Sequence, residues 1–171
     1  YLLTGIPLLV ASGVAAGMLQ YDVKAVGINL KKLLLQIPIG AIGFGLGYIE
    51  YLILHPQPLV ENLSFSSLWL PSLILFFFTG FTEELIFRGI MQKASMETFG
   101  KWGGILLVST VFAFLHIGHL SLMDVIFVFI VAIMFAELAY KTGSIIGVSL
   151  AHGITNITLY LVYPLIFGIS R

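Results

Sequence analysis

Long runs without Asp, Glu, Lys or Arg divide the chain into apolar segments that are separated by short polar ones. The runs cover residues 1–21, 33–49, 68–82, 102–123 and 142–170. A bilayer core needs about 20 consecutive apolar residues in a helix that crosses it, and several of these runs approach or exceed that length. The pattern therefore predicts an all-α fold, a polytopic transmembrane helical bundle.

The polar breaks place about six to seven spans in a single membrane-embedded domain, residues 1–171. Five of them are expected at 2–20, 33–54, 68–96, 102–117 and 122–140. A further span begins near residue 144, and the last 28 residues should hold it together with a partial return, with Pro164 as the break. Because residue 1 is Tyr rather than Met, we expect the native N-terminus to be missing.

Composition agrees with a membrane protein and removes several classes of function. Hydrophobic residues make up 59% of the chain and charged residues 9%, with a mean hydropathy of +1.07, whereas soluble domains carry about 25% charged residues. The formal net charge is zero, so no nucleic-acid partner is expected. The chain has no cysteine, which excludes thiol catalysis, disulfides and cysteine-based metal sites.

Lysine placement predicts how the bundle is oriented. The lysines of three alternate polar breaks are Lys24, Lys31, Lys32, Lys93, Lys101 and Lys141. The other two breaks, 55–67 and 118–121, contain neither Lys nor Arg. Cytoplasmic loops of membrane proteins are enriched in these residues, so the lysine-bearing loops of this multi-pass protein should face the cytoplasm.

Most remaining charges lie at expected helix ends and have a structural interpretation. Glu137 and Lys141 are four residues apart and predict an ion pair at the membrane surface. Glu50 and Asp124 also lie near expected membrane surfaces. Two histidines fall in polar breaks and are read in the same way, His55 and His119.

Glu83, Glu84 and Arg88 differ because they follow an apolar run without an intervening loop signal. Ionisable groups inside a bilayer are costly and point to a functional site. Glu84 and Arg88 are one helical turn apart and can pair, while Glu83 is rotated by about 100° from Glu84 and needs a separate partner. A buried structural ion pair would explain Glu84 and Arg88 but would leave Glu83 unexplained.

Three further polar residues supply candidate partners from other helices. His116 ends the fourth span, and His152 and Asn156 lie one turn apart in the last span. The depth of each group in the membrane can be estimated from its distance along the helix to a lysine at the helix end, at about 1.5 Å per residue. Roughly, Glu84 is 14 Å from Lys93, His152 is 17 Å from Lys141, and His116 is 22 Å from Lys101. The groups can therefore meet in one layer of the membrane.

Such a cluster can hydrolyse a peptide bond without a Ser or Cys nucleophile. A carboxylate and an imidazole can activate a water molecule, and His152 and Asn156 can both donate hydrogen bonds to a developing oxyanion. A zinc site built from His116, His152 and a glutamate is the chemical alternative. Because no His-Glu-x-x-His motif is present to favour zinc, we expect neither a metal nor another cofactor.

Three motifs in this order resemble those of the CPBP family, the CAAX prenyl endopeptidases and their prokaryotic relatives. They are Glu-Glu-x-x-x-Arg at 83–88, Phe-x-x-x-His at 112–116 and His-x-x-x-Asn at 152–156. The resemblance spans 83–156 and implies a glutamic-type intramembrane endopeptidase. It also implies a peptide or protein substrate within the lipid bilayer, and it leaves open whether that substrate is C-terminally prenylated.

The resemblance also implies a role for each motif residue. Glu83 and His116 would activate the water, and His152 with Asn156 would form the oxyanion hole. Glu84 and Arg88 would support the geometry of the site. Two other functions remain open: a non-catalytic scaffold or bacteriocin-immunity protein of the same fold, and a proton-coupled transporter that uses the cluster as a relay.

Overall fold

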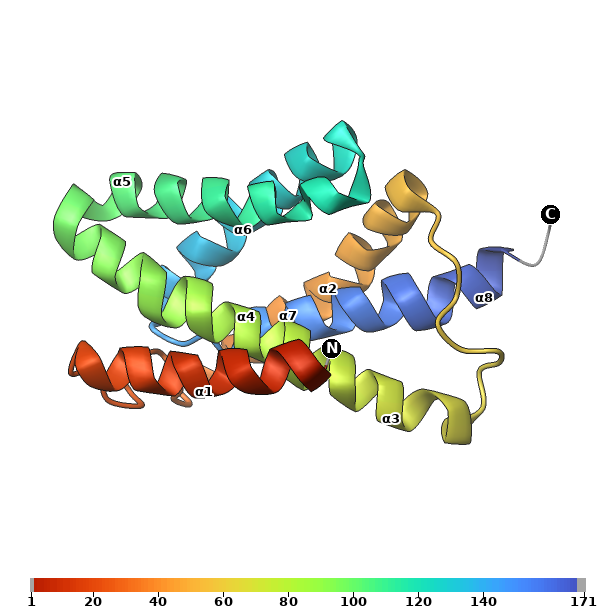
Figure 1. Ribbon diagram of the computed structural model, residues 1–171, viewed down its shortest axis with the longest axis horizontal. Helices are drawn as coiled ribbons and strands as arrows, with labels where there is room; N and C mark the ends of the chain where they lie inside the picture. Colours follow the sequence, from red (N-terminus) through yellow and green to blue (C-terminus); the bar gives the residue numbers. More distant parts are fainter. Residues whose placement is uncertain (1, 169–171) are drawn as a thin grey trace.

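The computed structural model describes residues 2–168, in which all regular secondary structure is helical (Figure 1). Three segments are π-helical (η1, η2 and η4) and η3 is a 3-10 helix. The elements are α1 (Leu2–Met18), α2 (Leu33–Leu54), α3 (Phe65–Leu75), η1 (Phe76–Phe81), α4 (Thr82–Glu84), η2 (Leu85–Met91), α5 (Gln92–Phe114), η3 (Leu115–His119), α6 (Leu122–Thr142), α7 (Ile146–Ile157), η4 (Thr158–Val162) and α8 (Tyr163–Phe167).

Within residues 2–168, four helices are long and apolar enough to cross a membrane. They are Leu33–Leu54, Phe65–His119, Leu122–Thr142 and Ile146–Phe167. Helix α1 is apolar but shorter, with 17 residues. The all-α class is therefore confirmed, and α2 begins and ends at the expected residues. The count of six to seven spans is not confirmed.

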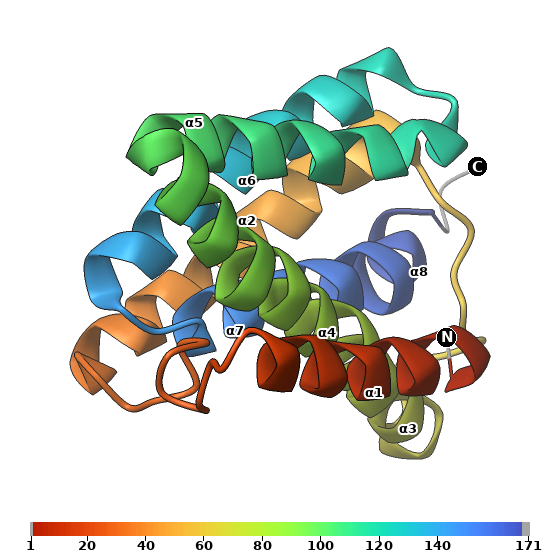
Figure 2. The same ribbon diagram turned by 60° about the vertical axis from the view of Figure 1, so that its left-hand side comes forward.

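The helix that runs from Phe65 to His119 changes direction sharply at one residue. Its 55 residues would extend over about 80 Å if straight, far more than a bilayer core. Gly100 has φ 73° and ψ 172°, a conformation that glycine adopts readily because it has no Cβ. Figures 1 and 2 show α5 folding back over α4 near this point. The expected turn at 97–101 is thus present, although the helical hydrogen bonding is nearly continuous through it.

The expected partial return at the C-terminus is wrong for the described residues. Ile146–Phe167 forms one helical segment through α7, η4 and α8. Pro164 is the second residue of α8 and lies inside this continuous segment. A wider π-helical turn precedes it, so the proline is accommodated and the helix continues in the same direction (Figure 1).

The three lysine-bearing loops meet at one end of the molecule. The Nζ of Lys32 donates to the Lys141 carbonyl at 2.7 Å, and the ammonium of Lys93 lies 4.1 Å from the ring centroid of Tyr21. The hydroxyl of Tyr21 donates to Glu97 at 2.7 Å. Desolvation together with this hydrogen bond raises the pKa of Tyr21 to about 12, so the phenol keeps its proton. We call this region the lysine end.

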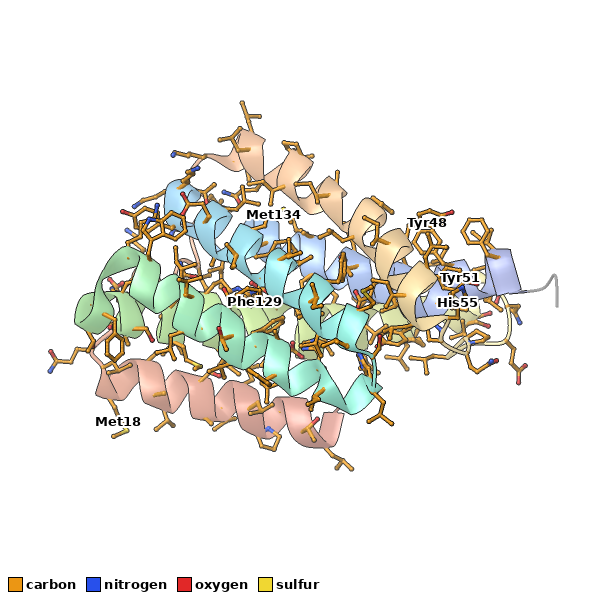
Figure 3. All side chains as sticks on the ribbon, turned by 90° about the horizontal axis from the view of Figure 1, so that it is seen from above. Met18, Tyr48, Tyr51, His55, Phe129 and Met134 are labelled. Atoms are coloured by element: carbon orange, nitrogen blue, oxygen red, sulfur yellow. The ribbon has the colours of Figure 1, made fainter. Side chains whose placement is uncertain are left out.

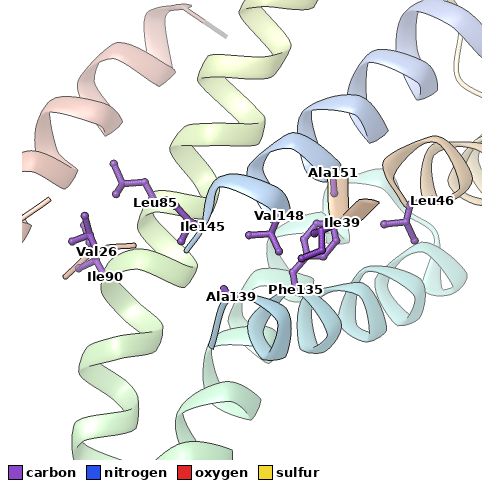
Figure 4. Packing of buried hydrophobic residues seen from close by; sticks show 10 residues of the cluster. All are labelled: Val26, Ile39, Leu46, Leu85, Ile90, Phe135, Ala139, Ile145, Val148 and Ala151. Carbon is purple, nitrogen blue, oxygen red and sulfur yellow. The ribbon is translucent and has the colours of Figure 1, made fainter. Parts of the chain in front are cut away.

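Close packing of α2 against α7 forms the centre of the bundle. A Cβ on Gly43 would collide with the carbonyl oxygen of Ala151, so only glycine permits this approach. Figure 4 shows Ile39 and Leu46 of α2 beside Ala151, with Phe135 of α6 completing the cluster. Leu85 and Ile90 of η2 belong to the same cluster, so this core joins α2, η2, α6 and α7.

The outer surface of the bundle is largely apolar, as expected of helices that face lipid. Large side chains such as Leu34 (84% exposed) and Ile130 (61% exposed) project outward. At the end opposite the lysine end, Tyr48 and Tyr51 pack against the aromatic residues of α8, and Tyr48 meets Tyr163 edge-to-face with ring centroids 5.6 Å apart. Figure 3 shows Tyr48, Tyr51 and His55 grouped there. Aromatic residues are enriched at membrane interfaces.

Candidate active site

One cavity receives side chains from all three motifs. It has a volume of about 370 Å³ and lies between α1, α2, the α3–η2 helix, α5 and α7. The polar groups on its wall are those of Glu50, Thr79, Glu83, His116, His119, His152, Asn156 and Tyr160. Four residues proposed from the sequence as catalytic are among them, so the structure brings these groups together. We call this space the main cavity.

Glu84 lies behind the cavity wall and holds two other motif residues in place. Its side chain is 0% exposed, and its Oε1 accepts from Nη1 of Arg88 at 2.8 Å and from Nδ1 of His152 at 2.8 Å. The guanidinium of Arg88 lies 4.4 Å from the ring centroid of Phe112 and donates to the Ala132 carbonyl at 3.4 Å. The expected Glu84–Arg88 pair is present, and it also orients the imidazole of His152.

Two glycines allow the helices that carry these residues to approach each other. A Cβ on Gly80 would lie 2.7 Å from the Cα of Gly153, closer than real Cβ contacts allow. Gly80 lies one turn before Glu84, and Gly153 directly follows His152. Because π-helical turns η1 and η2 flank α4, the backbone around both glutamates departs from regular α-helix, as is frequent at functional sites.

Glu83 projects into the main cavity rather than into the Glu84–Arg88 pair. Its side chain is 31% exposed, and its Oε2 lies 3.8 Å from Nε2 of His152. The separate partner that the helical geometry required is therefore His152. The imidazole of His152 lies between two carboxylates, Glu84 on Nδ1 and Glu83 facing Nε2.

The backbone fixes the tautomer of His116. Its Nδ1 lies 3.0 Å from the carbonyl oxygen of Phe112, one turn earlier in the same helix. A carbonyl only accepts, so Nδ1 carries the proton and the neutral imidazole keeps its lone pair on Nε2. This ring lines the main cavity. His116 can thus accept a proton from a water molecule there.

Asn156 is held by a hydroxyl of the facing helix. Its Nδ2 donates to Oγ1 of Thr79 at 2.8 Å, and that hydroxyl donates in turn to the carbonyl of Leu75. The amide has two N–H groups and Thr79 uses one of them, so the second can donate to another acceptor. Asn156 and His152 line the same cavity and supply two donors of the kind that an oxyanion requires.

Three residues of this site were not found by sequence reasoning. Glu50, read as a group near the membrane surface, is only 6% exposed and lines the main cavity. Asp124, read in the same way, is 0% exposed, and its Oδ2 lies 2.8 Å from Nδ1 of His119. The ring of His119 lies 5.7 Å from that of His116, centroid to centroid. The positions of Glu50 and Asp124 near helix ends concealed their burial, and no motif signals it.

The described residues, 2–168, offer little to a metal ion. No group of three or more His, Asp or Glu side chains in this part of the chain lies in an arrangement that could hold a metal ion. The side chains of Glu83, His116 and His152 share a cavity, but His152 and His116 each direct one ring nitrogen to a protein acceptor.

The chain was compared with protein-family models, curated proteins and solved structures. The family model described as type II CAAX prenyl endopeptidase Rce1-like matches residues 65–158, more than half of the chain. The matched region begins with α3 and ends at Thr158, so it contains all three motifs and leaves out α1 and α2. No curated protein and no solved structure matched. The family resemblance inferred from the three motifs is thereby confirmed.

Proposed function

This chain belongs to the type II CAAX prenyl endopeptidase Rce1-like family, and from that premise we propose that it hydrolyses peptide bonds with a water activated by Glu83 and His116. The family supports a membrane-embedded protease, and the apolar surface of the bundle agrees with it. The observation that carries the proposal is the shared cavity, to which the two arms of the kinked Phe65–His119 helix and α7 contribute the motif side chains.

Activation of the water rests on two bases of different kinds. Glu83 is the carboxylate that reaches the main cavity, whose volume leaves room for several water molecules beside a peptide. His116 offers the lone pair of Nε2 because its Nδ1–H is bound to the Phe112 carbonyl. The water can therefore give up a proton as its oxygen attacks the scissile carbonyl carbon.

Stabilisation of the tetrahedral intermediate is assigned to His152 and Asn156. Since the Nδ1–H of His152 is bound to Glu84, Nε2 can donate to an oxyanion only when the ring is an imidazolium. Two carboxylates and one guanidinium surround the ring, so an imidazolium makes the group of Glu83, Glu84, Arg88 and His152 electrically neutral. This balance supports the protonated form that the oxyanion hole requires.

Substrate and orientation follow from the same site. The cavity lies inside an apolar bundle, so the substrate is a peptide or protein segment that reaches it within the lipid bilayer. The lysine end faces the cytoplasm by the positive-inside rule. No cofactor is needed for the chemistry described here. A prenyl group on the substrate would lie against the apolar exterior of the helices.

Cleavage by purified protein in liposomes tests the proposal. The probes are a farnesylated peptide that ends in Cys-Ala-Ala-x and the same peptide without the farnesyl group. Glu83→Gln keeps the shape of the side chain but cannot accept the proton, so turnover should fall by about 10²–10⁴. The unfolding temperature should fall far less than in Glu84→Gln, because Glu83 is partly exposed and lies 3.8 Å from His152, whereas Glu84 holds Arg88 in a buried ion pair.

A matched control is Glu61→Gln, the same substitution in the exposed 55–64 linker. It should leave cleavage unchanged. Wild-type protein that cleaves neither peptide would contradict the protease, and normal cleavage by Glu83→Gln would contradict the choice of base. Mass spectrometry of the products distinguishes the farnesylated from the unmodified substrate.

A further inference from the structure

A second histidine lies beside His116 because α5 continues into the 3-10 helix η3. A 3-10 helix has three residues per turn, so side chains at positions i and i+3 lie above each other. His116 and His119 are three residues apart, and their ring centroids are 5.7 Å apart with an interplanar angle of 84°. Both rings line the main cavity. The proposed hydrolysis uses His116 and assigns no role to His119.

A buried carboxylate orients the ring of His119. Its Nδ1 lies 2.8 Å from Oδ2 of Asp124. Asp124 is 0% exposed, and its Oδ1 has no hydrogen-bond partner among residues 2–168. In this part of the chain every ion pair of a Lys or Arg goes to Glu84 or Glu137. His119 is therefore the group that can balance the charge of Asp124.

The turn between the two residues is built around this contact. Ser121 caps α6, and its hydroxyl accepts from the N–H of Asp124 at 3.2 Å. In a capping box the acidic residue at this position accepts the N–H of the capping residue in return, whereas Asp124 directs Oδ2 to His119. Leu120 lies between them with φ 54°, a left-handed conformation that is costly for a residue with a Cβ. A carboxylate that only capped the helix would need neither feature.

The proposed hydrolysis leaves one step without a group. The amine can leave only after its nitrogen has gained a proton, and His152 and Asn156 are already assigned to the oxyanion. His116 is poorly placed to deliver this proton, because the bond of its Nδ1 to the Phe112 carbonyl fixes the ring with Nε2 toward the water. His119 is the titratable group of the cavity wall whose ring contacts that of His116.

We propose that His119, oriented by Asp124, carries the proton from His116 to the leaving amine. The inference rests on the proposed hydrolysis in this cavity. Because Asp124 occupies Nδ1, Nε2 is the ring nitrogen that accepts and then donates the proton. The imidazolium of His119 exists only between the two transfers, and the buried carboxylate stabilises it, as the aspartate of a Ser-His-Asp triad does. His119 is thus a catalytic residue and Asp124 a positioning residue.

Each proton in this sequence has a donor and an acceptor. A water oxygen bonds to the carbonyl carbon, and one water proton is taken up by Glu83 and His116 and reaches Nε2 of His116. That proton moves to Nε2 of His119, directly or through one cavity water. The C–N bond breaks, its electron pair stays on nitrogen, and the proton of His119 bonds to that nitrogen. A carboxylic acid and an amine result, and every side chain returns to its starting state.

The test compares two leaving groups in the same purified protein. One substrate is the peptide, whose amine must be protonated to leave. The other is a 4-nitrophenyl ester of the same acyl segment, whose phenolate leaves without a proton. His119→Gln should slow peptide cleavage by about 10²–10⁴, while ester cleavage stays within a few-fold of wild type. His116→Gln should slow both reactions, because both need the activated water.

Asp124 is tested through its dependence on His119. Asp124→Asn should also slow the peptide and spare the ester, because a neutral amide cannot stabilise the imidazolium. Adding Asp124→Asn to His119→Gln should cost no further peptide cleavage, since Asp124 acts only through His119. A carboxylate that merely supported the fold would lower both reactions, and its loss would add to that of His119.

Ester cleavage also reports on folding, because it needs an intact cavity. The matched control is His55→Gln, the same substitution at an exposed histidine outside the main cavity. It should change neither reaction.

The outcomes are distinct. If His119→Gln slowed both substrates equally, or neither, the inference would be wrong while the protease stands. If wild type cleaved no peptide, or if Glu83→Gln and His116→Gln cleaved both substrates normally, the proposed function would fall and the inference with it.

Discussion

Glu84→Gln should destabilise the protein as well as inactivate it, because among residues 2–168 Glu84 is the only carboxylate that forms an ion pair with Arg88. Both partners are buried, with 0% and 1% of their side chains exposed. The Oε1 of Glu84 accepts 2.8 Å bonds from Arg88 and from His152. After the substitution the guanidinium keeps only a 3.4 Å bond to the Ala132 carbonyl and the face of Phe112. A neutral amide cannot balance its charge.

The magnitude follows from leaving a charge buried without its partner. Removing one member of a buried pair costs about 3–5 kcal/mol, whereas replacing both members with apolar groups is often neutral. Glu84→Gln should therefore unfold at a clearly lower temperature than wild type. Adding Arg88→Met should recover most of the loss, since no unpaired charge remains. Activity should stay low in both variants, because His152 lacks the carboxylate on its Nδ1.

Thermal unfolding in detergent and peptide cleavage, measured on the same samples, test this reasoning. Glu137→Gln is the control: Glu137 pairs with Lys101 and Lys141 at the lysine end, where water screens the charges. It should change the unfolding temperature much less. If Glu84→Gln were as stable as wild type, or if adding Arg88→Met lowered stability further, the buried pair would not have the role assigned to it.

Three other predictions concern the oxyanion hole, the metal alternative and the orientation. Asn156→Ala should lower turnover by about 10²–10³ with little change in substrate affinity, and single-turnover cleavage beside a binding assay checks it; near-normal turnover would remove Asn156 from the site. Elemental analysis of active protein should find no stoichiometric zinc, and activity restored by zinc after chelation would overturn the glutamic mechanism. Cysteines introduced at Lys31, Glu97 and Lys141 should react only with a reagent applied from the cytoplasmic side, and labelling of position 97 from outside would reverse the orientation.

The sequence alone determined the class of fold and the chemistry of the motifs. Long apolar helices can be exposed only to lipid. The run of apolar residues between two polar breaks therefore gives the bounds of α2. Glu84 and Arg88 are one turn apart on any helix, so their pairing follows from local geometry. The need of Glu83 for a separate partner follows from the same helical periodicity.

Only the tertiary structure decided which polar groups share the cavity. A helix that is apolar on all sides does not reveal which face is turned inward, so Glu50 near the end of α2 looked like an interfacial residue. The pairing of His119 with Asp124 and the placement of Asn156 against Thr79 depend on contacts between residues that no local rule brings together. Pro164, which usually breaks a helix, is tolerated because a π-helical turn absorbs it. Sequence fixes what each segment can form, whereas the rotation of each helix about its axis is set by close packing at glycines, and that rotation decides which side chains meet.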